Sequence, residues 1–337
     1  VPAETLTVYF FWRGMNRAER AAPSFLWAGF FLGAGIYTYA VARLFPLLFV
    51  AFVPLWFWQD RSALARHGRH VALMAGASLL TALPLLLFFA RYPYFFVFRL
   101  AYVANKGLGA VEGRPWLTWL NNVWRVGGLF WQGETHLRHN LPGRPYLDPI
   151  QAVLFGVGVL GNGRFWRHRR LVFLFIWLGV MLLPTILSGD APHFGRMVGI
   201  APVAAIFIAL GLVKVAQWTA DWAAAHAPRS GRWLAWVILG LLVGGSLFLT
   251  VRDYFFRYAR HPQLAEAFYV PDWQMGRYAA AQPPDTAVYL TPTQEEMATI
   301  YFAMANPERL RSYSGGSGLI PAGLPGASAL YLVRPTD

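Results

Sequence analysis

The chain has 337 residues, of which 56% are hydrophobic and only 13% are charged. Because a soluble domain carries about 25% charged residues, the composition excludes an ordinary soluble protein and indicates a polytopic helical membrane protein. The absence of cysteine excludes disulfides and cysteine-ligated metal sites. The net charge of +13 is explained by basic loops on the cytoplasmic side of a membrane, so no nucleic-acid partner is expected.

The first part of the chain predicts a bend between two membrane spans. Residues 8–12 look like the end of a helix, so we expect a partial first span and an N-terminal part that is absent from this sequence. Residues 21–59 contain a single charged side chain, Arg43. One helix of that length would be roughly 58 Å long, about twice the thickness of the hydrocarbon core. We therefore predict two spans that bend at Arg43 and Pro46.

Charge distribution predicts the orientation of the chain. Further spans are expected at residues 71–90, 149–163, 171–187, 197–213 and 233–251, which gives about seven spans besides the partial one. The polar segments between them include four basic clusters, expected as loops, at residues 13–20, 60–70, 164–170 and 214–232. If successive spans cross the membrane in opposite directions, all four clusters lie on the same side. The positive-inside rule identifies that side as cytoplasmic. The Arg43 bend, the loop 91–148, the turn 188–196 and the C-terminal tail then face outward.

The outward loop 91–148 contains a helical pattern of aromatic residues. Apolar side chains recur at the spacing of one helix face, at Trp116, Trp119, Leu120, Val123 and Trp124. This pattern predicts an amphipathic helix that lies in the headgroup region. The alternative is aromatic anchoring at the interface without any ligand.

The chain is expected to form two domains, a transmembrane helical domain at 1–251 and a soluble extracytoplasmic α/β domain at 252–337. In the second domain we predict helices at 272–281 and 294–305. Short strands are predicted at 287–290, 310–313 and 329–333.

Polar residues of the outward segments are candidates for binding. Arginines suited to a lipid phosphate are expected near the outer headgroup plane, at Arg43, Arg138, Arg144 and Arg196. The alternative is ordinary contact with lipid headgroups. Asp190 is expected to pair with Arg196 or simply to end a helix. His136, His139 and His193 match no recognised ligand spacing, so no metal site is predicted.

Three of these segments, residues 33–46, 138–149 and 190–196, resemble a bacterial glycosyltransferase of the GT-C superfamily. The closer similarity is to the C-terminal two-thirds of the dolichyl-phosphate-mannose protein mannosyltransferase-like family, family 39. The resemblance implies a polyprenyl-phosphate-linked sugar donor and chemistry at the extracytoplasmic face. It also implies a catalytic aspartate in a loop upstream of this chain, so no catalytic residue is assigned here and the chain alone is expected to be inactive.

The residues expected to bind substrate are therefore Arg43, Arg138, His139, Asp190, His193 and Arg196. The expected partners are the lipid-linked donor, membrane lipids and an acceptor that is a protein, lipid or glycan, and no cofactor is assigned. The expected location is the cell membrane. Alternatives are a transporter or flippase, a polysaccharide polymerase, and a membrane scaffold without catalytic activity. The predicted spans contain prolines, Pro84, Pro184 and Pro202, which are compatible with the broken helices of transporters, so the transporter is retained as an alternative.

Overall fold

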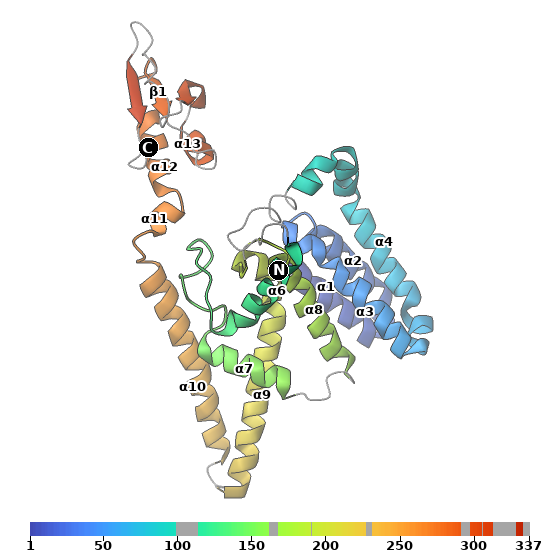
Figure 1. Cartoon of the computed structure of the whole chain (residues 1–337). Coiled ribbons are helices and arrows are strands. Elements are labelled where there is room, and N and C mark those ends of the chain that lie inside the picture. The colour runs from blue at the N-terminus through green and yellow to red at the C-terminus, as the bar shows by residue number, and fades with distance from the viewer. Residues whose placement is uncertain are drawn as a thin grey trace. The chain divides into compact units, whose positions relative to one another are not determined.

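The computed structural model describes residues 1–98, 114–161, 168–189, 191–226, 231–290, 297–304, 306–312 and 328–332. The chain is mostly helical and forms two compact units, Val1–Asp253 and Tyr254–Asp337 (Figure 1).

Helices make up the first unit. Its described α-helices include α1 (Pro2–Asn16), α2 (Ala21–Gly35), α3 (Pro46–Gln59), α4 (Arg61–Arg91), α6 (Pro115–Gly127), α7 (Pro149–Leu160), α8 (Arg169–Ile186), α9 (Ala201–His226) and α10 (Gly231–Val251). Two 3-10 helices are important for the site, η2 (Ala40–Leu44) and η5 (Phe194–Ile200).

Five helical segments among the described residues are long and apolar enough to cross a membrane. They are Ala40–Gln59, Arg61–Arg91, Arg169–Ile186, Phe194–His226 and Trp233–Tyr258, while α2 and α7 are shorter apolar helices. This result indicates a membrane protein. The total of about seven spans remains a prediction.

The predicted bend between α2 and α3 is confirmed. Helix α2 ends at Gly35, whose carbonyl accepts hydrogen bonds from the Thr38 backbone N–H at 3.1 Å and its hydroxyl at 2.7 Å. Pro46 occupies the first turn of α3, where its missing N–H costs no helical hydrogen bond and its fixed φ suits the helix. The chain therefore turns between residues 36 and 45.

Three of the four segments predicted as basic loops are instead largely helical. In the first, residues 13–16 belong to α1 and Ala18–Arg20 form a 3-10 helix. In the third, residues 164–167 lie outside the described residues. Helix α4 begins at Arg61 because the Asp60 carboxylate caps it, accepting a hydrogen bond from the Ala63 N–H at 3.1 Å. Helix α9 continues to His226 and so includes Lys214. The loop predictions were wrong here because arginine, lysine, alanine and leucine all favour helices outside the hydrocarbon core as well as inside it.

Close backbone contact joins α7 to α9. A Cβ atom on Gly158 would collide with the Phe207 carbonyl, and one on Gly211 would collide with the Leu154 carbonyl. Small residues at such a crossing are typical of membrane helices, whose association depends on close packing. An aromatic cluster joins α1, α3 and α8 elsewhere in the unit, with the Phe11 and Phe173 rings stacked at 5.9 Å.

The second unit contains a three-stranded parallel sheet in the order β2-β1-β3. The strands are β1 (Ala287–Leu290), β2 (Leu310–Ser312) and β3 (Ala329–Leu332), so all three predicted strands are confirmed within about one residue at their ends. Helices α12 (Val270–Ala280) and α13 (Met297–Ala303) pack with the sheet through Ala279 and Ile300.

Candidate functional site

A buried carboxylate connects the loop 133–148 to the segment 191–196. The side chain of Glu134 is only 1% exposed. Its Oε2 accepts a hydrogen bond from the Phe194 backbone N–H at 2.6 Å, across 60 residues of sequence. Its Oε1 lies 2.9 Å from His139 Nδ1 and 3.4 Å from His136 Nδ1. Glu134 thus joins these two segments by hydrogen bonds to both.

Three imidazole rings gather around this carboxylate. The ring centroids of His139 and His193 are 4.5 Å apart, and His136 lies 6.0 Å and 5.7 Å from them. The backbone N–H of His193 donates to the Thr185 hydroxyl at 2.9 Å, which ties the turn to the end of α8. Ligand atoms of Glu134, His139 and His193 all lie within 4.8 Å of one another.

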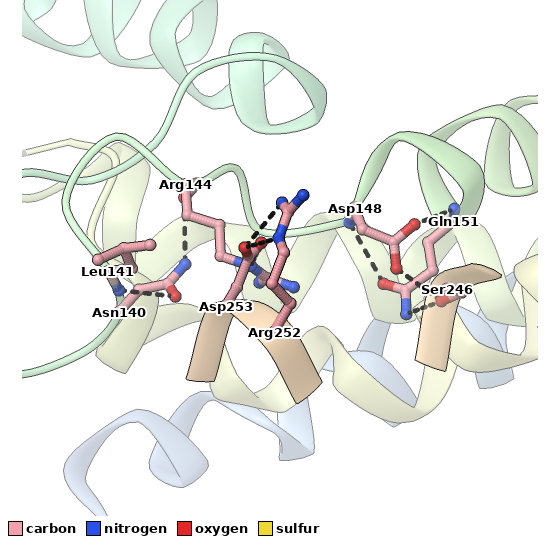
Figure 2. A network of polar contacts seen from close by, with 8 residues as sticks. All are labelled: Asn140, Leu141, Arg144, Asp148, Gln151, Ser246, Arg252 and Asp253. Atoms are coloured by element: carbon pink, nitrogen blue, oxygen red, sulfur yellow. Dashed lines mark hydrogen bonds and ion pairs between the residues drawn. The ribbon is translucent and has the colours of Figure 1, made fainter. Parts of the chain in front are cut away.

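The loop 133–148 is folded tightly on itself, which fixes the position of Glu134. Gly143 has a φ of +77° and donates its backbone N–H to the Glu134 carbonyl at 3.1 Å. Positive φ is readily adopted by glycine. Asn140 accepts from the Leu141 N–H at 2.9 Å and donates to the Arg144 carbonyl at 3.1 Å (Figure 2).

The other end of this loop is held against α10. The Ser246 hydroxyl donates to the Asp148 carboxylate at 2.6 Å and accepts from the Gln151 amide at 3.0 Å. Asp148 also accepts from the Gln151 backbone N–H and forms a capping box at the start of α7 (Figure 2). The loop is therefore fixed at both ends by polar contacts.

Helix α6 confirms the amphipathic helix predicted around Trp116–Trp124. Its buried positions are Thr118, Asn122 and Val126, and the Asn122 amide donates to the carbonyls of Ile186 at 2.9 Å and Ser188 at 2.6 Å. Its tryptophans face away from the protein and are exposed, Trp124 by 80%. The polar face thus binds the end of α8 next to the turn, while the apolar face is left uncovered by described residues.

The structure brings together some of the predicted substrate-binding residues. His139 and His193 lie in the cluster. Arg138 directly precedes His139 in the sequence and is exposed, and Arg196 is half-buried. The guanidinium of Arg43 lies over the Phe89 ring at 4.8 Å, and its buried Nε has no hydrogen-bond partner among the described residues. Asp190 lies outside the described residues, so its predicted pairing with Arg196 stays a prediction.

Glu134 was not among the residues predicted from the sequence. It precedes His136 by two positions and His139 by five, a spacing that belongs to no common ligand pattern. An acidic residue next to two histidines in a polar loop was the one local signal.

Comparison with protein-family models, curated proteins and solved structures finds no match. The resemblance to family 39 therefore stays a prediction from the three sequence segments.

Proposed function

We propose that the protein is an integral membrane glycosyltransferase that takes its sugar from a polyprenyl-phosphate donor at the extracytoplasmic face. One observation carries this proposal. The three segments that resemble family 39 are far apart in sequence, yet parts of them meet in the first unit. Helix η2 contacts η5, and the loop that contains Arg138 and His139 is joined to η5 through Glu134 and Phe194.

The chemistry of the donor explains why cations are needed there. Breaking the bond between sugar and phosphate leaves a charged lipid phosphate, and positioned cations stabilise the charge that develops in the transition state. Arginine binds phosphate through paired hydrogen bonds. We assign this role to Arg43 and Arg196, with Arg138 as an additional exposed cation. A carboxylate that accepts the proton of the acceptor hydroxyl completes an inverting transfer.

Binding and transfer can be measured separately with protein produced from the full gene in nanodiscs. Polyprenyl phosphate is titrated against the protein, and transfer is followed from radiolabelled polyprenyl-phosphate sugars. Loss of one charge-assisted contact, worth about 1.5–3 kcal/mol, should weaken binding roughly tenfold or more in Arg196→Gln and in Arg43→Gln.

Arg17→Gln is the matched control, because Arg17 is exposed and belongs to a cluster expected on the opposite side of the membrane. It should bind the lipid normally. Wild-type protein that neither binds polyprenyl phosphate nor transfers sugar would rule out the proposed function.

A further inference from the structure

We propose that Glu134, His139 and His193 form a binding site for a divalent transition-metal ion of the zinc class. The site would join the loop 133–148 to the segment 191–196. It would exist whether or not the protein transfers sugars, because it depends only on the ligand atoms and their surroundings.

The spacing of the ligand atoms fits one ion. Zinc binds histidine nitrogen and carboxylate oxygen at about 2.0–2.2 Å, which places tetrahedral ligands roughly 3.4 Å apart. Glu134 Oε1 and His139 Nδ1 are 2.9 Å apart, and the ligand atoms of all three residues lie within 4.8 Å of one another. The tetrahedral spacing lies between these two distances, so the side chains would shift when an ion binds.

The surroundings of Glu134 hold its carboxylate in place for this role. Its Oε2 accepts the Phe194 N–H at 2.6 Å, while Oε1 faces the imidazoles. A hydrogen bond to the second oxygen of a ligating carboxylate orients it toward the metal. The side chain is 1% exposed, and a nearby cation stabilises a buried carboxylate that has lost its hydration.

The donor atoms decide which ions fit. Two imidazoles with one carboxylate favour zinc and neighbouring transition metals, whereas calcium and magnesium prefer ligand sets made of oxygen atoms. His136 is 51% exposed and its Nδ1 lies 3.4 Å from Glu134 Oε1. His136 is therefore a nearby imidazole that could supply a fourth ligand.

Packing around the rings also restricts what can replace the neighbouring glycine. A Cβ atom on Gly195 would lie 3.1 Å from two atoms of the His139 ring and 3.2 Å from Cε1 of His193. These distances are shorter than normal van der Waals contacts between such atoms. Gly195 therefore permits both rings to approach the same point from opposite segments.

The test uses Co(II) as the probe, because its visible absorption reports the number and type of ligands. Tag-free protein from the full gene is treated with a chelator in detergent and then titrated with Co(II). Wild-type protein should bind about one equivalent with a tetrahedral spectrum. His139→Ala and His193→Ala should each bind at least about tenfold more weakly, since even partners of ligands contribute that much. His168→Ala, at an exposed histidine outside the cluster, should bind as the wild type does.

Cysteine variants separate ligation from misfolding. The chain has no cysteine, so His139→Cys or His193→Cys supplies a single new thiolate. Each should retain Co(II) and add a thiolate-to-cobalt charge-transfer band. Absence of that band in both variants, or wild-type binding no tighter than that of the alanine variants, would overturn the metal site.

Discussion

The Nε atom of Arg144 lies 3.1 Å from Oδ2 of Asp253, although 109 residues separate them in the chain. Both side chains are nearly buried, with 9% and 8% of their surfaces exposed. The other oxygen of Asp253 accepts hydrogen bonds from Arg252 at 3.0 Å and 2.8 Å (Figure 2). One carboxylate thus joins two arginines and holds the loop 133–148 at the end of α10. This pairing favours a positioning role for Arg144 over the contact with phosphate expected from the sequence.

Removal of one member of this pair should destabilise the first unit. Arg144→Met removes one of the positive charges that stabilise the buried Asp253 carboxylate. The loss should lower the free energy of unfolding by about 3–5 kcal/mol. Asp253→Asn should have an effect of similar size. The double variant should lose less than the sum of the two, because the residues interact directly. Thermal unfolding in detergent, followed by tryptophan fluorescence, measures all three.

Arg252→Met is the control for this series. The Arg252 side chain is 44% exposed, and exposed ion pairs contribute about 0–1 kcal/mol. Equal effects of Arg144→Met and Arg252→Met would contradict the role of Arg144 described above.

Substitution of Gly158 should disrupt the contact between α7 and α9. The added methyl group of Gly158→Ala would collide with the Phe207 carbonyl, and such overpacking costs about 1–3 kcal/mol. Gly156 lies on the same helix, and a Cβ atom there would meet no described atom within 4 Å, so Gly156→Ala should be tolerated. Urea or thermal unfolding of the two variants side by side measures the difference. Equal stability of both variants would show that α7 and α9 are not packed this closely.

The exposed face of α6 should lie in lipid. Thr118 and Asn122 are buried against the protein, while Leu120 and Trp124 are 62% and 80% exposed. Because the chain has no cysteine, single cysteines at Leu120 and Trp124 can carry spin labels in nanodiscs. Both labels should be more accessible to oxygen, which concentrates in the bilayer, than to a water-soluble nickel complex.

A label at Gln282, a residue of the second unit outside the apolar helices, should show the reverse preference. Preferential contact of the α6 labels with the nickel complex would instead place this face in water. It would also exclude anchoring of α6 at the interface.

The predicted orientation can be tested in intact cells. Thr135 and Ser62 are both exposed, and the charge distribution predicts that Thr135 lies outside and Ser62 in the cytoplasm. A cysteine at Thr135 should react with a membrane-impermeant thiol reagent, and a cysteine at Ser62 should react only after the cells are permeabilised. The opposite pattern would reverse the orientation and remove the basis for extracytoplasmic sugar transfer.

The sequence by itself predicted the class of protein and most of the local elements. Long apolar runs indicate membrane helices because a backbone in hydrocarbon must satisfy its own hydrogen bonds. The turn before Pro46, the aromatic face of α6 and the strand Ala287–Leu290 were also predicted, since each depends on neighbours a few residues away. The start of α4 and the C-terminal end of α9 were not, because basic residues outside the membrane are compatible with both loop and helix.

Only the tertiary structure decided which polar residues meet. His139 and His193 were candidates on their own, but Glu134 became one only when its carboxylate was found beside them. Arg144 was assigned to phosphate from its charge alone, before Asp253 was known to lie next to it. Contacts across 60 or 109 residues leave no periodicity or spacing in the sequence, because they are set by how the helices pack. The sequence therefore determines the helices and their charges, and the packing determines the chemistry that those charges can perform.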